Sequence, residues 1–143
     1  MDTFSAAERA AIMRRVRGKD TGPEMTVRRM VHGMGFRYSL HRADLPGKPD
    51  LVFPCRGKVI FVHGCYWHRH DCHLGRPMPR TRRAFWEPKL LGNKARDKRV
   101  QRDLRRLGWS VLVVWECQTR SVRREWLLKR LTAFLKHRKA RQR

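Results

Sequence analysis

Acidic residues are scarce in this 143-residue sequence: 12 Asp and Glu stand against 35 Lys and Arg, which leaves a formal charge of +23. A chain with this charge attracts polyanions, so nucleic acid is the first partner to consider, ahead of an anionic membrane surface or a merely solvated basic exterior. Long apolar runs are lacking too. The longest, 59–62 and 111–115, fall far short of the roughly 20 residues of a membrane helix, and no apolar leader opens the chain. We expect a cytoplasmic protein without a membrane span.

The sequence also lacks internal repeats and any linker long enough to separate two units. Its length is that of one ordinary domain, and 41% hydrophobic residues suffice for one core. We therefore predict a single domain over 1–143. Within it, 1–20 form a basic N-terminal arm that contacts DNA phosphates or is simply solvated, and 136–143 form a basic, frayed tail.

Apolar, β-branched stretches predict strands at 36–41, 51–53, 58–62 and 110–115. A short turn with proline and glycine separates the second and third, so these two are expected to pair as an antiparallel hairpin. The last strand follows a helical crossover and should lie parallel in the sheet. The pattern as a whole indicates an α/β domain.

Apolar residues at helical spacing predict three helices beyond the arm, the first capped by the pattern at 21–24 and the second broken at Gly92. Their expected core-facing residues are Val27, Met30, Val31 and Met34, then Val100, Leu104 and Leu107, and finally Val122, Trp126, Leu131 and Leu135.

Cysteine is scarce as well, with four in the chain, and in a reducing compartment these suggest metal before disulfide. Cys65, His70 and Cys72 have the spacing C-x4-H-x-C, and Cys117 follows the last predicted strand. Three thiolates and one imidazole are typical of a structural zinc site, although some of them could instead be buried thiols and surface imidazoles. The competing or unused donors are His68, His73 and Cys55.

Carboxylate and imidazole side chains near the hairpin suggest phosphodiester cleavage. Asp50 begins a strand opposite the far end of its partner, where it could hold Mg²⁺ together with the main-chain carbonyl of Val62. His68 or His63 could then activate water, since imidazole exchanges protons near neutral pH. Glu24 is ambiguous, because its place in a helix cap explains it fully.

Two adjacent aromatic residues, Tyr66 and Trp67, lie among the predicted zinc ligands. Aromatic rings in such a loop could wedge between base pairs, or they could pack against the metal site. The Glu-x-Lys element of many restriction-type nucleases is missing after the second strand of the hairpin. A zinc-stabilised module that binds mismatched or deformed DNA without cutting it is therefore an alternative to a nuclease.

Five blocks of sequence together resemble the very-short-patch repair endonucleases, also called DNA mismatch endonucleases. The blocks are Leu45-Pro-Gly-Lys-Pro-Asp50, Phe61-Val-His-Gly-Cys-Tyr-Trp-His68, His70-Asp-Cys72, Phe85-Trp86 and Val114-Trp-Glu-Cys117. The resemblance covers most of the chain. It implies a restriction-endonuclease-like fold, with a central mixed β-sheet flanked by helices and a structural zinc site. It also implies a Mg²⁺-dependent nick in double-stranded DNA, 5′ to the thymine of a T·G mismatch left by deamination of 5-methylcytosine.

The resemblance also implies roles for individual residues. Asp50 would bind magnesium, His68 would be the general base, and His63 and Glu24 would organise the attacking and metal-bound waters. The implied zinc ligands are Cys65, His70, Cys72 and Cys117. The residues implied to contact DNA are the inserted Tyr66, Trp67 and Trp86, Met13 from the N-terminal arm, and Lys89 and Asn93 at the mismatched pair.

Departures from the family pattern occur at four positions. Val62 replaces a common threonine, Tyr66 replaces the usual phenylalanine, and Arg69 and Asp71 replace histidines. Each could alter the range of mismatches or the flanking sequence that is preferred. From the family we further expect a monomer, and the sequence leaves open whether general mismatch-repair proteins are its partners. A nuclease that cuts by sequence, irrespective of mismatch, would keep the same catalytic residues.

Overall fold

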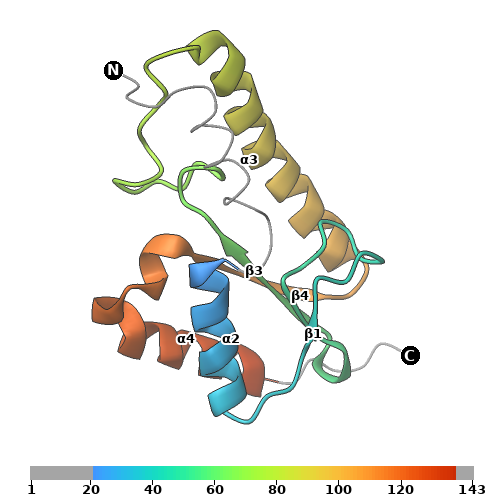
Figure 1. Cartoon of the computed structure of the whole chain (residues 1–143). Coiled ribbons are helices and arrows are strands. Elements are labelled where there is room, and N and C mark those ends of the chain that lie inside the picture. The colour runs from blue at the N-terminus through green and yellow to red at the C-terminus, as the bar shows by residue number, and fades with distance from the viewer. Residues whose placement is uncertain (1–20, 138–143) are drawn as a thin grey trace.

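A mixed sheet forms the centre of the computed structural model, which describes residues 21–137 (Figure 1). Within these residues the sheet has four strands in the order β1 (Ser39–Leu40), β2 (Leu51–Phe53), β3 (Lys58–His63) and β4 (Ser110–Trp115). β1, β2 and β3 pair antiparallel, whereas β3 and β4 are parallel. The predicted mixed sheet, its hairpin and its parallel last strand are confirmed. The predicted arm at 1–20, with Met13, and residues 138–143 of the predicted tail lie outside the described residues.

The hairpin between β2 and β3 turns through a 3-10 helix, Pro54–Arg56, and closes at Gly57 with a left-handed φ of 66°. Glycine adopts this conformation without a steric penalty. The strand predicted at 36–41 forms only at Ser39–Leu40. β2 has only three residues before Pro54, which lacks an N–H, so it offers its neighbour few partners.

Helices cover both faces of the sheet. α2 (Gly22–Gly33) and α4 (Arg124–Lys136) lie on one face, and α3 (Arg83–Arg106) lies on the other (Figure 1). The first face packs Leu51, Phe53, Ile60, Leu112 and Val114 against Val27, Val31, Leu127, Leu131 and Leu135. The second face packs Val52, Val59 and Phe61 against Leu104. Alternation of side chains along each strand thus divides the apolar residues between two layers.

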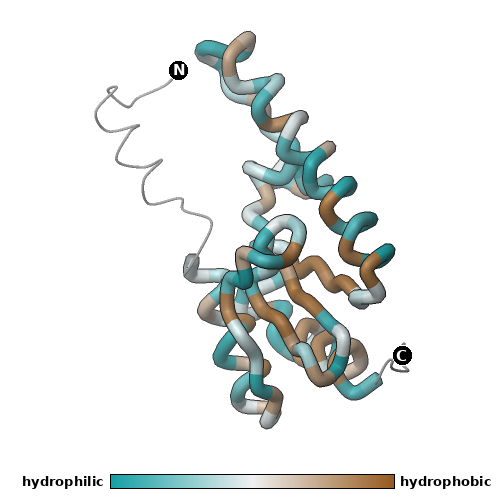
Figure 2. Tube along the Cα trace, turned by 90° about the vertical axis from the view of Figure 1, so that its right-hand side faces the viewer, coloured by the Kyte–Doolittle hydropathy of each residue, from teal (hydrophilic) through white to brown (hydrophobic). Residues whose placement is uncertain are grey.

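α3 is one continuous helix of 24 residues, so the predicted break at Gly92 is wrong. A glycine costs a helix only about 1 kcal/mol relative to alanine. Contacts on both sides of it outweigh this: Leu90 is fully buried, and Asn93 donates a hydrogen bond to the main chain of the preceding loop. Figure 2 shows hydrophobic residues concentrated in the strands, whereas hydrophilic residues recur along α3. Leu107, predicted to face the core, is 63% exposed.

α4 was predicted in the right place; of its predicted core-facing residues, Leu131 and Leu135 are buried as expected, whereas Val122 and Trp126 are not. Leu127, Leu131 and Leu135 are fully buried, one turn apart. Trp126 is 41% exposed and Val122, which precedes the helix, is 88% exposed. The guanidinium of Arg123 covers the Trp126 ring at 4.4 Å from its centroid, so this aromatic residue lies on the surface in a cation–π contact.

Among residues 21–137, no helix has the length and apolar character needed to cross a membrane.

Candidate active site and metal centre

The ends of three strands meet at one end of the sheet, because β2 is antiparallel to β3 and β4 is parallel to β3. The start of β2 therefore adjoins the ends of β3 and β4. Asp50 precedes β2, His63 ends β3, and Cys65 and Cys117 follow β3 and β4. This pairing pattern gathers most of the predicted site residues at one end of the sheet.

Glu24, His41 and Asp50 form the first cluster, which we call the two-acid group. One donor atom of each lies within 4.8 Å of the others. Asp50 Oδ2 accepts a hydrogen bond of 2.7 Å from the Val62 N–H, and Glu24 Oε2 lies 2.9 Å from His41 Nε2. Burial and the neighbouring Glu24 carboxylate raise the pKa of Asp50 to about 8, although the Val62 N–H acts in the opposite direction. Two buried carboxylates in one place suit a cation.

Glu24 does more than cap α2. Its backbone N–H donates to Thr21 Oγ1 at 3.3 Å, as the capping pattern predicts. Its carboxylate is turned instead into the two-acid group and is 1% exposed. Arg28 Nη1 lies 3.5 Å from the same carboxylate oxygen that contacts His41. Glu24 therefore serves both the helix start and the cluster.

His63, His68 and Asp97 form the second cluster, the two-histidine group. His68 Nδ1 lies 2.5 Å from Asp97 Oδ2. The imidazole of His63 stacks on that of His68, with centroids 3.9 Å apart and planes 4° from parallel. Burial, and then the neighbouring His68, lower the pKa of His63 to about 3, so its ring is neutral at neutral pH. His63 Nδ1 lies 4.0 Å from Asp97 Oδ2 and is buried without a hydrogen-bond partner among the described residues.

The structure divides the predicted site residues between two groups. Asp50 clusters with Glu24 from α2, whereas His63 clusters with Asp97 from α3. His41 and Asp97 were not predicted as site residues. The sequence did contain an indication of Asp97. Trp86, Leu90, Val100 and Leu104 form an apolar stripe at helical spacing on α3, and the polar residues Asn93 and Asp97 interrupt it. No pattern indicated His41, which was the last residue of a predicted strand.

The four predicted zinc ligands, Cys65, His70, Cys72 and Cys117, lie together with their donor atoms within 4.8 Å of one another. His70 Nδ1 is 3.6 Å from Cys65 Sγ and 3.5 Å from Cys117 Sγ. Tetrahedral zinc, with Zn–S near 2.3 Å and Zn–N near 2.1 Å, would hold a sulfur and a nitrogen about 3.6 Å apart. The donor set and its spacing therefore fit zinc.

Burial affects the titration of this cluster. It raises the pKa of the Cys65 and Cys117 thiols and lowers the pKa of His70, although Asp71 opposes the last shift. A metal ion binds the thiolate and the neutral imidazole, so ion binding would release protons from the thiols. Cys55 and His73, the other possible donors, are exposed and lie outside the cluster.

Main-chain contacts set the shape of the loop that carries these ligands. Glu116 Oε1 accepts a hydrogen bond of 3.2 Å from the Cys65 N–H and so joins the ends of β3 and β4, a role that sequence reasoning missed. At Gly75 a Cβ would lie 2.0 Å from the carbonyl oxygen of His70, so only glycine fits there. Arg69, one of the departures from the family pattern, donates to the carbonyls of Arg76 and Pro77 at 2.9 and 2.8 Å.

Trp115 connects the cysteine cluster with the two-histidine group. Its ring stacks on His70, with centroids 4.2 Å apart and planes 12° from parallel, and it meets His63 edge-on at 5.3 Å. A shift of His70 would therefore be transmitted through one rigid ring to His63 and the His68 that stacks on it. The order of the cysteine cluster thus bears on the position of both histidines.

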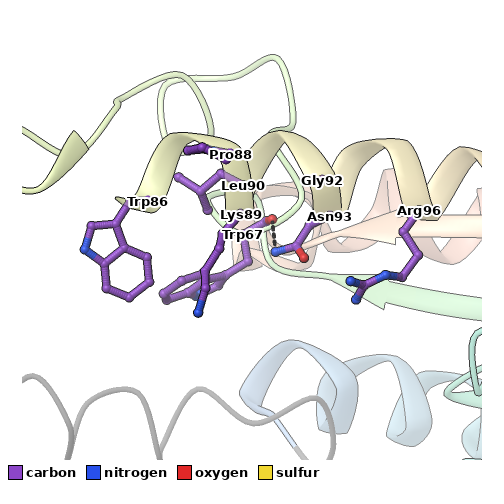
Figure 3. Close-up of a pocket in the computed structure, with 8 residues that line it drawn as sticks. All are labelled: Trp67, Trp86, Pro88, Lys89, Leu90, Gly92, Asn93 and Arg96. Carbon is purple, nitrogen blue, oxygen red and sulfur yellow. Dashed lines mark hydrogen bonds between the residues drawn. The ribbon is translucent and has the colours of Figure 1, made fainter. Parts of the chain in front are cut away.

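Four of the predicted DNA-contacting residues, Trp67, Trp86, Lys89 and Asn93, line one groove of about 400 Å³ along the first half of α3 (Figure 3), which we call the aromatic groove. Trp67 and Trp86 meet edge-on with centroids 6.2 Å apart, and Tyr66 packs edge-on against Trp67 at 5.2 Å. Asn93 Nδ2 donates a hydrogen bond of 3.2 Å to the Trp67 carbonyl oxygen. In Figure 3, Lys89 points to the same side as the two indole rings. Loop and helix thus present the aromatic and polar groups together.

Comparison with known proteins shows which family the chain resembles. The family model for the DNA mismatch endonuclease Vsr matches residues 1–74, just over half of the chain. The type II nicking enzyme V.XorIIP of Xanthomonas oryzae is 49% identical over 117 residues, which cover 82% of this chain and 85% of that protein. The type II nicking enzyme V.NmeAIP of Neisseria meningitidis is 36% identical over 120 residues, with coverages of 84% and 85%.

A third relative is the DNA mismatch endonuclease Vsr of Escherichia coli K12, which is 41% identical over 119 residues, covering 83% of this chain and 76% of that protein. Identity at this level, over most of the length of both proteins and together with the family model, establishes the relationship. The chain belongs to the DNA mismatch endonuclease Vsr family.

Proposed function

We propose that this protein nicks double-stranded DNA 5′ to the thymine of a T·G mismatch in a Mg²⁺-dependent reaction, and so starts very-short-patch repair of deaminated 5-methylcytosine. Its membership of a family whose members are named mismatch endonucleases and nicking enzymes supports this. The single observation that carries the proposal is the placement of the two-acid group and the two-histidine group at one end of the sheet. One cluster suits a cation and the other suits proton transfer.

Asp50 and the main-chain carbonyl of Val62 are proposed to hold the magnesium ion. The Val62 N–H donates to Asp50, and in an extended strand the N–H and C=O of one residue point to the same side. The carbonyl is thus directed toward Asp50, and a valine at position 62 supplies it as well as a threonine would. Magnesium bound there would neutralise charge on the scissile phosphate and on the leaving oxygen.

His68 is proposed to take the proton from the attacking water. Asp97 can only accept a hydrogen bond when ionised, so the proton between them lies on His68 Nδ1 and leaves the Nε2 lone pair free to act as a base. Once His68 gains a second proton, Asp97 stabilises the imidazolium. The neutral His63 stacked on it adds no opposing charge. His68 is 28% exposed, so water can reach it.

The aromatic groove is proposed to recognise the mismatch. Tyr66, Trp67 and Trp86 offer flat apolar surface that could enter the base stack, and a mispaired step costs less to unstack than a paired one. Lys89 and Asn93 lie beside the indole rings and could contact the exposed base edges. The Asn93 hydrogen bond to Trp67 keeps helix and loop in register for this contact.

Zinc held by Cys65, His70, Cys72 and Cys117 is proposed to be structural. The loop between Cys65 and Cys72 carries Tyr66, Trp67 and His68, so the same ligands that close the loop also fix the wedge and the base. Four protein ligands leave no open position for a substrate, which is the arrangement of structural zinc sites. The energy of zinc binding would contribute directly to the folding of this loop.

A strand-resolved cleavage assay tests the proposal. The duplexes are identical except that they carry T·G, another mismatch or a full complement, in mixed flanking sequence, and Mg²⁺ is present or omitted. We expect a nick only in the thymine strand of the T·G duplex and only with Mg²⁺. The control is Asp50→Asn with the same zinc content. Tight mismatch binding without any nick would indicate a binding module, and equal cutting of paired duplexes would indicate a sequence-directed nuclease.

A further inference from the structure

His41 occupies an unusual position between the two buried carboxylates. Its backbone is left-handed, with φ at 47°, a region in which histidine is more frequent than most non-glycine residues. The His41 N–H donates to the Asp50 carbonyl oxygen at 3.2 Å, and the imidazole reaches back to Glu24 with Nε2 2.9 Å from Oε2. The main chain of His41 is therefore hydrogen-bonded to the main chain of Asp50, and its side chain contacts the carboxylate of Glu24.

The three donors of the two-acid group form a mixed nitrogen and oxygen set. The two carboxylates are buried, at 1% and 6% exposure, whereas the His41 side chain is 21% exposed. The cluster therefore reaches solvent at its imidazole, so an ion can enter on that side. Two buried carboxylates this close together repel each other when both are ionised, and a divalent ion would remove that repulsion.

We propose that His41 is a metal ligand of this site, and that its imidazole makes the site bind Mn²⁺ more tightly than Mg²⁺. Imidazole nitrogen suits first-row transition ions, whereas magnesium favours an octahedron of oxygen atoms and dehydrates reluctantly. Mn²⁺ accepts carboxylate and imidazole alike. In the metal-free protein His41 Nε2 contacts Glu24; in the loaded protein the same nitrogen binds the ion. The inference rests on the proposed function only in assigning a divalent ion to Asp50.

Binding of Mn²⁺ is measured on the zinc-loaded full-length protein without DNA, from the loss of the free-ion electron paramagnetic resonance signal and by calorimetry. Mg²⁺ is titrated separately and as a competitor, and zinc content is checked afterwards. The key variant is His41→Asn, because asparagine tolerates the left-handed backbone while removing the imidazole. The matched control is His32→Asn, whose exposed side chain lies on the last turn of α2, outside the cluster.

We expect one Mn²⁺ per chain, bound about tenfold or more tightly than Mg²⁺. His41→Asn should weaken Mn²⁺ about tenfold or more and change Mg²⁺ affinity little, whereas His32→Asn should change neither. Equal Mn²⁺ affinity in the wild-type protein and His41→Asn would overturn the proposal. So would an equal loss for both ions, which would make His41 a support for Glu24 rather than a ligand.

A second readout does not depend on the folding of the variant. Electron spin-echo modulation from the wild-type Mn²⁺ complex should contain the coupling of a directly bound ¹⁴N nucleus, and its absence would contradict the assignment. The outcome is separable from the proposed function. Mg²⁺-dependent nicking without nitrogen coordination would refute only the role of His41. Nitrogen-coordinated Mn²⁺ without nicking of any duplex would refute only the nuclease.

Discussion

The two-acid group and the two-histidine group are built from the same side chains in opposite proportion. Glu24 and Asp50 outnumber His41 in the first, whereas His63 and His68 outnumber Asp97 in the second. α2 contributes to the first and α3 to the second, and these helices cover opposite faces of the sheet. In both groups burial shifts a pKa, upward for the carboxyl of Asp50 and downward for the imidazole of His63.

Under the proposed function, this difference in proportion separates two tasks of phosphodiester cleavage. Two buried carboxylates repel each other until a cation joins them, so the first group is suited to hold a metal ion. Two stacked imidazoles cannot both be charged without repulsion, and burial lowers the pKa of His63, so His68, paired with a carboxylate, is the better proton acceptor of the two. The two tasks would then fall to separate groups of residues that lie at the same end of the sheet.

Asp50→Asn should have the largest effect on nicking. Asparagine preserves the shape of the side chain but removes the charge that would bind the ion, so single-turnover nicking of a T·G duplex should fall at least about a thousandfold. Affinity for the same duplex, measured without Mg²⁺, should change little, because the aromatic groove is intact. A fully active Asp50→Asn protein would refute the assignment of the cation to the two-acid group.

His68→Ala and Asp97→Asn test the roles of the two-histidine group in nicking. Loss of the base should slow nicking about several hundredfold, and loss of its carboxylate partner about tenfold to a hundredfold. Because Asp97 acts through His68, the double variant should be about as slow as His68→Ala alone. Rate losses that multiply in the double variant would mean that Asp97 acts independently of His68.

Cys117→Ser tests whether the two-histidine group depends on the cysteine cluster through Trp115. We expect loss of stoichiometric zinc and a decrease of about 3 kcal/mol or more in the free energy of unfolding. Nicking should fall even with saturating Mg²⁺. Cys55→Ser is the matched control, since this cysteine is exposed and outside the cluster. Zinc retained at one per chain in Cys117→Ser would require another ligand set.

The pH dependence of stability also distinguishes the two groups, because Asp50 and His63 contribute with opposite sign. With its pKa near 8, Asp50 stabilises the folded state below its ordinary pKa of 3.8, and this contribution is lost as pH rises toward 8. Without added divalent ions, the stability of Asp50→Asn relative to wild type should therefore increase between pH 5 and pH 8, by about 3 to 4 kcal/mol. Denaturant unfolding at several pH values measures this.

The contribution of His63 runs the other way. Its stabilising effect is present above its ordinary pKa of 6.5 and is lost as pH falls toward 3, and it is common to both proteins, so it cancels in the difference. Saturating Mg²⁺ should reduce the pH-dependent difference. A difference that stays constant from pH 5 to pH 8 would show that the Asp50 carboxyl is not protonated in the metal-free protein.

Local sequence patterns predicted the features that depend on neighbouring residues. The strand and turn signals around 51–63 predicted the hairpin that brings Asp50 to Val62, and the spacing of Cys65, His70 and Cys72 predicted a shared cluster. In each case the residues that interact lie close in sequence. The parallel pairing of β4 followed from the helical crossover.

Three residues that reach the site through tertiary packing were missed. His41 meets Glu24 across 17 positions, Asp97 meets His68 across 29, and Glu116 meets Cys65 across 51. No local pattern encodes such contacts. Trp126 was wrongly predicted to face the core for a related reason, although Leu131 and Leu135 of the same helix were predicted correctly. Trp126 is hydrophobic, but Leu127 packs in the core instead and the indole lies under an arginine.

The most direct test of the division of labour is the single-turnover rate of T·G nicking as a function of Mg²⁺ concentration in wild type, Glu24→Gln and Asp97→Asn. We predict that Glu24→Gln raises the Mg²⁺ concentration needed for half the maximal rate, because it removes a carboxylate from the cation site. Asp97→Asn should lower the maximal rate and leave that concentration unchanged. The same shift in both variants would contradict the separation of cation binding from proton transfer.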